Sequence, residues 1–285
     1  MINRILTFGR MIKFSHSIFA LPFALSGVLL ASIRSEITPI MVGWIVVAMV
    51  GARSAAMGFN RWADRKMDAE NPRTANRELP TAQISSGAVI AFIVLSSAVL
   101  IYAAYRLNPL CFALSPVALA IVFFYSLTKR FTWATQFFLG LSLSVAPIGA
   151  WIAVTGTLDL EILALGGAVL LWVAGFDIIY ATGDADFDRQ FGAYSIPQRF
   201  GVAIALWIAR TLHLTAFLAM MLVGHVFELG IVYYVGVAGI GMLLIYEHRL
   251  VKPDDLSKAG IAFMNLNAAI SVAYFLFTAI DVLAV

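Results

Sequence analysis

Nine apolar stretches of about 18–22 residues recur along the chain and constrain its fold more than any other feature. About 20 residues of helix cross a bilayer; a strand would need about ten residues with strict alternation of apolar and polar side chains, and that alternation is absent. The stretches occupy residues 15–33, 38–58, 86–106, 109–127, 134–154, 160–182, 200–223, 229–247 and 259–281. The pattern predicts an all-α polytopic membrane protein with nine transmembrane helices, residues 1–285 forming one domain.

The composition excludes several other classes of protein. Apolar residues make up 61% of the chain and charged residues 12%, whereas about 25% of an ordinary soluble domain is charged. A soluble globule of 285 residues could not bury that much apolar side chain. A cytosolic enzyme, a disordered chain and a secreted disulfide scaffold are therefore excluded. The single cysteine, Cys111, allows no intrachain disulfide.

The distribution of lysine and arginine predicts the orientation in the membrane. With the N-terminus inside, 15 of the 19 lysines and arginines fall in inner loops, and only Arg34 and Arg106 fall in outer ones. This asymmetry follows the positive-inside rule. Two inner loops, 59–85 and 183–199, are longer than a connection requires, which is common for functional loops. We expect the N-terminus and these loops at the cytoplasmic face of a bacterial inner membrane, and the C-terminus outside.

The first long loop begins with polar residues at helical spacing. Asn60, Asp64 and Asp68 stand at i, i+4 and i+8, so a helix places all three on one face at the inner end of the second span. Arg53 lies seven residues earlier, deeper on the same face. Carboxylates gathered in this way need a cation to offset their repulsion.

A second acidic face follows the sixth span. Asp177, Asp184 and Asp188 stand at 0, +7 and +11, again on one helix face, with Tyr180 about 60° away. Asp177 lies inside an apolar run, where a carboxylate is a functional-site hypothesis by default. Oxygen ligands without a histidine or cysteine cluster favour Mg²⁺, which is usually held by a few carboxylates together with substrate phosphates.

Cationic side chains accompany both acidic faces. Arginine binds phosphate oxygens as a fork and lysine as a point charge, so this combination predicts a diphosphate site. The cations are Arg61, Arg65, Lys66, Arg73, Arg77, Lys129, Arg130, Arg189 and Arg199.

Several segments resemble the UbiA family of intramembrane aromatic prenyltransferases. Residues 60–68 (NRWADRKMD) with 73–80 (RTANRELP) look like its first aspartate-rich motif, and 177–188 (DIIYATGDADFD) resembles the second. Residues 125–130 (YSLTKR) resemble the lysine segment between helices four and five, and 14–23 (FSHSIFALPF) is similar to the opening helix of quinone-pathway members. The resemblance covers nearly the whole chain, although Arg61 follows Asn60 where many members have an aspartate.

The resemblance implies a fold and a reaction. The helices are expected to surround a central cavity that opens to the cytoplasmic face, and the enzyme to transfer a polyprenyl group from a diphosphate donor to a phenolic acid through an allylic carbocation. Apolar walls would exclude the water that quenches such a cation. Two Mg²⁺ ions are expected to be held by Asn60, Asp64, Asp68, Asp184 and Asp188.

The resemblance also implies roles for other residues. Lys129 is the candidate for both catalysis and diphosphate binding, and Asp177 and Tyr180 are the candidates to orient or deprotonate the acceptor. Arg53 is expected to bind either the diphosphate or the carboxylate of an aromatic acid. Further candidates for binding the diphosphate or acceptor are Arg65, Arg73, Arg77 and Arg130.

Two alternatives to the leading function remain. The first choice of acceptor is 4-hydroxybenzoate, in ubiquinone or menaquinone biosynthesis; a dihydroxynaphthoate of menaquinone synthesis is the second. The alternative of a different class is a cation-coupled transporter, but transporters place charge near the midplane, whereas these acids gather at one membrane face. We expect membrane lipid and the two substrates as partners and no nucleic acid; chain length and oligomeric state are left open.

Overall fold

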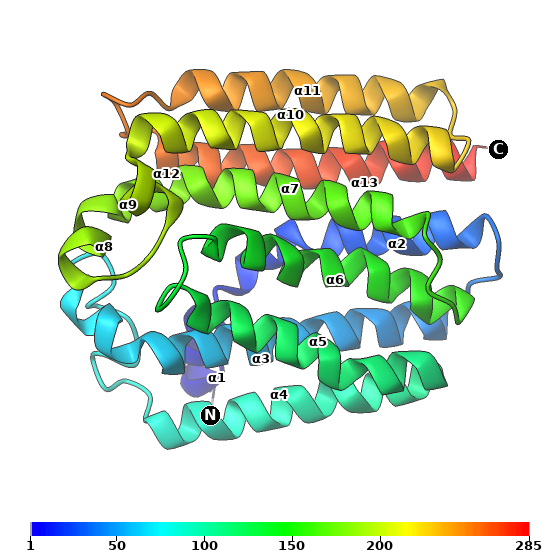
Figure 1. Cartoon of the computed structure of the whole chain (residues 1–285). Coiled ribbons are helices and arrows are strands. Elements are labelled where there is room, and N and C mark those ends of the chain that lie inside the picture. Colours follow the sequence, from blue (N-terminus) through cyan, green and yellow to red (C-terminus); the bar gives the residue numbers. More distant parts are fainter. Residues whose placement is uncertain (1, 285) are drawn as a thin grey trace.

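The computed structural model describes residues 2–284, and the side chains of residues 7–13 and 17–284 among them. Within that range the protein consists of helices, most of them joined by short turns, with a longer loop at residues 71–85 between α3 and α4 (Figure 1). The long helices are α3 (Pro39–Glu70), α4 (Ser86–Leu107), α5 (Pro109–Thr128), α6 (Thr135–Thr155), α7 (Ile162–Ala181), α10 (Val202–Val226), α11 (Ile231–Leu250) and α13 (Asn267–Leu283). The shorter elements are α1 (Ile2–Met11), η1 (Phe14–Phe19), α2 (Leu21–Ser32), η2 (Thr182–Asp184), α8 (Ala185–Phe191), α9 (Ile196–Phe200), α12 (Ala259–Ile261) and η3 (Ala262–Leu266).

Eight of the described helical segments are long and apolar enough to cross a membrane. The first predicted span instead contains a shorter apolar helix, Ser17–Ser32, so the count of nine holds only if this helix is included. The chain turns at Lys13, whose φ is 46°, and passes through the 3-10 segment η1 before α2 begins. These irregular residues shorten the helix at its inner end.

The boundaries of the two long loops also differ from the prediction. The second predicted span continues as α3 to Glu70, so the first part of loop 59–85 is helical. Thr38 accepts a hydrogen bond from the Met41 N–H (3.2 Å) and Pro39 fixes the first turn, which sets where α3 begins. The predicted loop 183–199 contains α8 and α9. The acidic motifs are therefore carried on helices beyond the apolar spans.

Helix α7 lies at the centre of the bundle. It packs between α6 and α10, while α2 lies against α6 and α13, and α4 runs along α3 (Figure 1). In its most apolar 18 residues 67% are buried within the protein, against 17% for α5, so α7 faces other helices and α5 faces lipid. Close backbone approach makes this packing possible: a Cβ on Gly27 of α2 would lie 2.5 Å from the Pro147 carbonyl oxygen of α6.

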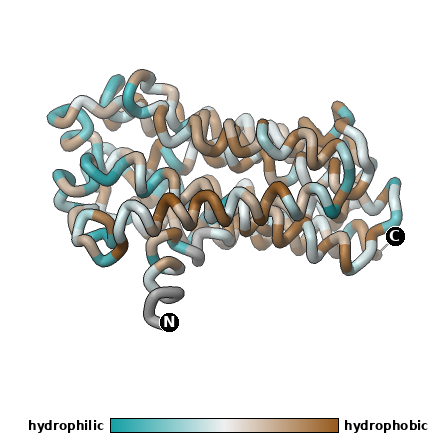
Figure 2. Tube along the Cα trace, turned by 90° about the horizontal axis from the view of Figure 1, so that it is seen from below, coloured by the Kyte–Doolittle hydropathy of each residue, from teal (hydrophilic) through white to brown (hydrophobic). Residues whose placement is uncertain are grey.

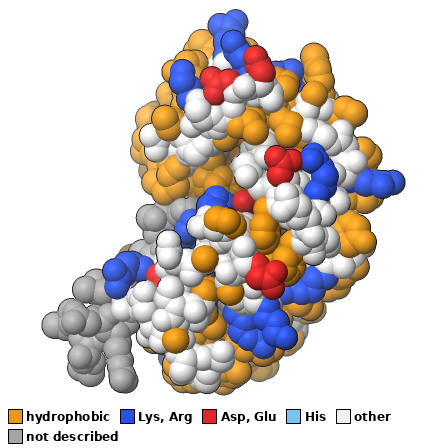
Figure 3. Space-filling view, turned by 90° about the vertical axis from the view of Figure 1, so that its left-hand side faces the viewer, with side chains coloured by type: hydrophobic (Ala, Val, Ile, Leu, Met, Phe, Trp, Pro, Cys, Tyr) orange, Lys and Arg blue, Asp and Glu red, His pale blue; other side chains and the backbone are white. Residues whose placement is uncertain are grey.

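The connections that follow α3, α5, α7 and α11 all lie at one end of the bundle, on the left in Figure 1, which we call the polar end. The C-terminus lies at the opposite end. Hydrophilic residues gather at the ends and hydrophobic residues between them (Figure 2). Seen end-on, the polar end carries lysines and arginines beside acidic residues (Figure 3). The predicted inner loops therefore share one end of the molecule.

An apolar cavity of about 420 Å³ lies between α2, α3, α4, α5 and α6. Its walls are mostly aliphatic, with Arg53, Asn60 and Tyr125 among the few polar side chains. One of these residues, Asn60 of α3, is also the first residue of the first acidic motif. The cavity thus leads from the interior of the bundle to the polar end.

Candidate active site

The first cluster of candidate ligands (Asn60, Asp64 and Asp68) lies at the end of α3, on one face as the spacing predicts. Asp64 is 2% exposed and forms ion pairs with Lys129, which ends α5, and with Arg130 (Nη2 to Oδ1, 3.0 Å). The Asn60 Nδ2 donates to the second Asp64 oxygen (3.1 Å). Two cations from a neighbouring helix end thus neutralise a buried carboxylate.

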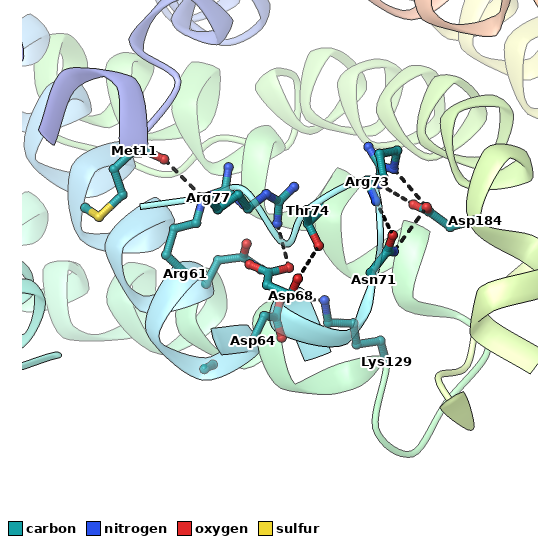
Figure 4. A network of polar contacts seen from close by, with 12 residues as sticks. Met11, Arg61, Asp64, Asp68, Asn71, Arg73, Thr74, Arg77, Lys129 and Asp184 are labelled. Atoms are coloured by element: carbon teal, nitrogen blue, oxygen red, sulfur yellow. Dashed lines mark hydrogen bonds and ion pairs between the residues drawn. The ribbon is translucent and has the colours of Figure 1, made fainter. Parts of the chain in front are cut away.

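Asp68, one turn further along α3, is paired from the loop that follows. The Arg77 Nη1 lies 2.7 Å from the Asp68 Oδ1, and the Thr74 hydroxyl donates to the Asp68 backbone carbonyl (3.0 Å). The loop after α3 therefore folds back over the acidic face (Figure 4). The first cluster receives its cations from two directions.

The second cluster (Asp177, Asp184 and Asp188) lies where α7 breaks into η2 and α8. Asp184 pairs with Arg73 through both of its carboxylate oxygens; the Arg73 Nε lies 2.8 Å from Oδ1. The Ser195 hydroxyl donates to the Asp188 Oδ2 (2.9 Å). Asp177 interacts electrostatically with Lys129, Arg73 and Asp184.

Arg73 joins the two clusters. It belongs to the loop after α3, and its guanidinium donates to Asp184 and to the Tyr180 hydroxyl while lying 4.9 Å from the centre of the Tyr180 ring. Asn71 reinforces this crossing, because its side chain accepts from the Arg73 N–H and donates to Asp184 (Figure 4). Burial lowers the pKa of Arg73, but Asp184 and Tyr180 outweigh that effect and raise it, so the side chain stays charged.

The chemistry that this arrangement allows follows from its donors. Carboxylate oxygens from two helix ends lie beside lysine and arginine side chains, and Asn60 of the first cluster also lines the apolar cavity. Among the described residues, no three His, Cys, Asp or Glu side chains converge closely enough to hold a metal ion by themselves. Hard oxygen donors that leave coordination positions for a substrate suit Mg²⁺ bound together with phosphate oxygens.

Comparison with known families decides the classification. The model of the UbiA prenyltransferase family matches residues 20–269. The chain belongs to this family. Its membership makes the protein a prenyltransferase and displaces the transporter alternative.

Curated relatives and solved structures agree with this membership. The UbiA protein is 34% identical to a 4-hydroxybenzoate octaprenyltransferase of Vibrio campbellii over 80% of this chain and 81% of the relative. It is 32% identical to the 4-hydroxybenzoate octaprenyltransferase of Nitrosospira multiformis, over 78% of this chain and 76% of the relative. The apo structure of a UbiA homologue from Aeropyrum pernix superposes with a TM-score of 0.79, at 30% identity over 94% and 97% of the two chains. A homologue from Archaeoglobus fulgidus bound to GPP and Mg²⁺ has the same fold, with a TM-score of 0.70 at 16% identity over 98% and 100%.

Arg53 lies apart from the two clusters of this UbiA protein, on the cavity wall. Its Nη2 donates to the Lys13 carbonyl (3.0 Å), and its buried Nε has no hydrogen-bond partner among the described residues. A buried N–H without a partner is costly and rare in proteins. Arg53 therefore presents an unused donor beside the cavity.

Arg65 is placed differently from the other predicted cations. It turns back along α3, donating to the Trp62 carbonyl (2.7 Å) and stacking on the Trp62 ring, and it contacts neither acidic cluster. Two residues that the sequence did not single out contribute instead: Asn71 supports Asp184, and Ser195 supports Asp188. The sequence could have indicated these two residues only by their position, since each lies in a loop beside an acidic motif.

Proposed function

We propose that the protein transfers a polyprenyl group from polyprenyl diphosphate to a ring carbon of 4-hydroxybenzoate in quinone biosynthesis, with Mg²⁺ as the metal. The observation that carries the proposal is that two carboxylate clusters and their cations lie together at the polar end, with Asn60 of the first cluster lining the apolar cavity. The relatives named 4-hydroxybenzoate octaprenyltransferase support this acceptor over a dihydroxynaphthoate. The homologue bound to GPP and Mg²⁺ supports the donor class and the metal.

Two Mg²⁺ ions are proposed, with the first cluster and Asp184 and Asp188 of the second as ligands. The oxygen-only donor set fits Mg²⁺, and because no three of the described His, Cys, Asp or Glu side chains converge, the substrate's phosphate oxygens would complete the coordination shells. When bound, the metal supplies Lewis-acid stabilisation of the departing diphosphate. The protein's own contribution is to hold the carboxylates at two facing helix ends.

The cations of the site bind the diphosphate oxygens in this proposal. Lys129 and Arg130 lie beside Asp64, Arg77 beside Asp68, and Arg73 beside Asp184, so each is within reach of a phosphate held between the clusters. Arginine forks bind phosphate oxygens in pairs. Departure of the diphosphate breaks the allylic C–O bond, and the bonding electron pair leaves with it.

The apolar cavity receives the reacting end of the prenyl chain. Its aliphatic walls give the allylic cation no water to react with, which favours attack by the aromatic ring. The new C–C bond takes an electron pair from the ring, and loss of the ring proton restores aromaticity. Asp177 and Tyr180 lie in the last turns of α7, near the polar end. They are the proposed groups that orient the acceptor or accept this proton.

Arg53 is the proposed partner of the acceptor carboxylate. Arg53 lines the cavity and its buried Nε has no hydrogen-bond partner among the described residues, so a carboxylate in the cavity would lie beside a guanidinium whose hydrogen-bonding capacity is not filled. Binding there would direct the phenol ring toward the polar end. The excess of lysine and arginine at that end supports placing the site at the cytoplasmic face of a bacterial inner membrane.

The proposed function is tested with the purified full-length protein in lipid nanodiscs. Octaprenyl diphosphate is supplied with 4-hydroxybenzoate or with 1,4-dihydroxy-2-naphthoate, in Mg²⁺ or in EDTA, and products are identified by mass spectrometry. We expect prenylated 4-hydroxybenzoate that disappears in EDTA. Prenylated naphthoate in place of prenylated benzoate would overturn the acceptor, and full turnover in EDTA would overturn the metal site.

A further inference from the structure

A second cavity, of about 270 Å³, lies beside the first cluster at the polar end. We call it the basic pocket. Five cationic side chains line it, together with the single carboxylate of Glu78. The cations are Arg10, Lys13, Arg61, Arg73 and Arg77.

The walls of the basic pocket are fixed by hydrogen bonds and packing. Arg61 is 5% exposed, and its Nε donates to the Met11 carbonyl at the end of α1 (3.0 Å), as Figure 4 shows. The Arg53 Nη2 donates a hydrogen bond to the Lys13 backbone carbonyl (3.0 Å), which fixes the turn that follows α1. The fully buried Met11 side chain belongs to an apolar cluster with residues of α4. The cations are therefore held together by the fold.

Concentrating like charges in this way is costly unless an anion offsets them. Burial lowers the pKa of Lys13 to about 8, with further contributions from Arg61, Arg77 and Arg73. Arg73 and Arg77 are paired with Asp184 and Asp68, which leaves the single carboxylate of Glu78 to offset Arg10, Lys13 and Arg61. The pocket thus has a net positive charge in a partly enclosed volume, which favours a compact anion of high charge.

Two arginines connect the basic pocket to the active site. Arg77 lines the pocket and pairs with Asp68 (2.7 Å), and Arg73 lines the pocket and pairs with Asp184. Both can therefore bind an anion on either side without a change of backbone.

We propose that the basic pocket is a second phosphate-binding site, which takes the inorganic diphosphate released by prenyl transfer. The choice of diphosphate rests on the proposed function, whereas the affinity of the pocket for phosphate anions does not. Arg10 and Lys13 belong to this site alone, since neither contacts an acidic residue of the two clusters. They give the product a path away from the metal ligands.

The test measures binding of inorganic diphosphate to the full-length protein in EDTA and neutral phosphatidylcholine nanodiscs, with no donor or acceptor present. Lys13→Gln and Arg10→Gln are each expected to raise the Kd about tenfold. Lys13→Arg keeps the charge and is expected to stay within about twofold. Unchanged affinity in both glutamine variants overturns the proposal. Arg10 is exposed, so its variant remains informative if Lys13→Gln lowers the thermal midpoint.

Arg189→Gln is the matched control, since it removes one cation at the same end of the molecule. Arg189 is exposed and pairs with Asp186 on its own helix (2.8 Å), away from the basic pocket. We expect its Kd to match that of the unmodified protein. An equal loss of affinity in this control would indicate a general charge effect and overturn the site.

A lipid headgroup offers the same phosphate chemistry and is distinguished by a second arm. The titrations are repeated in nanodiscs containing phosphatidylglycerol. If the pocket serves inorganic diphosphate, the difference between the unmodified protein and Lys13→Gln persists. If the difference disappears, the headgroup occupies the pocket and the diphosphate assignment falls. Because no turnover is measured, a failure here is separate from a failure of the proposed reaction.

Discussion

In the proposed function both acidic clusters hold Mg²⁺, but their structural surroundings differ. The first lies on the unbroken helix α3, and its Asp64 is 2% exposed and held by two cations. The second lies where α7 breaks into η2 and α8, and its Asp184 is 18% exposed and paired with one arginine. The first cluster is therefore part of the packed structure, whereas the second depends on a side chain that crosses from a loop.

Because of this difference, we expect substitutions in the first cluster to lower both stability and activity, and substitutions in the second to lower mainly activity. Asp64 is buried between Lys129 and Arg130, which are 27% and 36% exposed, so removing its charge should disturb packing as well as the proposed ligand binding. Removing a charge from the second leaves a half-exposed Arg73 that water can solvate, so the change acts mainly on the ligand. The predictions below test that contrast.

The largest effect is expected from Asp64→Asn. Loss of this carboxylate should lower kcat/KM for prenyl transfer by roughly 10²–10³-fold. It should also lower the free energy of unfolding by roughly 2 kcal/mol, because Lys129 and Arg130 lose their partner. Both are measured in nanodiscs, by turnover and thermal unfolding. Asp254→Asn, at an exposed acid of the same end, serves as control and should change neither; a stable, fully active Asp64→Asn protein would contradict the assignment.

Asp184→Asn should separate the two properties. We expect kcat/KM to fall by roughly 10²-fold while the free energy of unfolding changes by less than about 1 kcal/mol. The Mg²⁺ concentration for half-maximal activity should rise. A loss of stability as large as that of Asp64→Asn would show that the two clusters contribute equally to the stability of the fold.

Arg73→Lys tests the link between the clusters. Lysine keeps the charge but cannot reach both Asp184 oxygens and the Tyr180 hydroxyl, so KM for the donor should rise roughly tenfold with kcat less affected. Steady-state kinetics with octaprenyl diphosphate measure this, with Arg189→Lys as control. If kcat falls while KM is unchanged, Arg73 acts in the chemical step and not in donor binding.

The smallest effect concerns pH. The charged form of Lys13 binds an anion, and its pKa is about 8, so diphosphate affinity should be nearly complete at about pH 7 and below, and fall about three- to fivefold between pH 8 and 9. Arg10, Arg61, Arg73, Arg77 and Glu78 line the same pocket. In Lys13→Arg the loss should disappear. The same fall in both proteins would assign the pH dependence to a group other than Lys13 and contradict the prediction.

Much of the fold could be predicted because membrane spans have a strong signal. Apolar length placed the long helices, and helical spacing correctly placed Asn60, Asp64 and Asp68 on one face of α3. The family followed from the acidic motifs and was confirmed. Apolar length could not show that α3 continues to Glu70 or that the first span is short, since both depend on local turns such as that at Lys13.

The partners of the charged residues could not be predicted. The crossing of Arg73 to Asp184 joins residues more than 100 positions apart, and the turn of Arg65 onto Trp62 depends on which side of α3 faces solvent. The basic pocket requires the end of α1 to fold against α3, which no local pattern encodes. These are consequences of tertiary packing.

A double-mutant cycle tests most directly whether the two clusters act on one diphosphate. Values of kcat/KM for the donor are measured for the unmodified protein, Asp64→Asn, Asp184→Asn and the double variant. If the clusters hold one ligand together, the double variant should lose no more than about tenfold beyond the worse single variant. If the two losses multiply, each cluster acts independently and the shared site is contradicted.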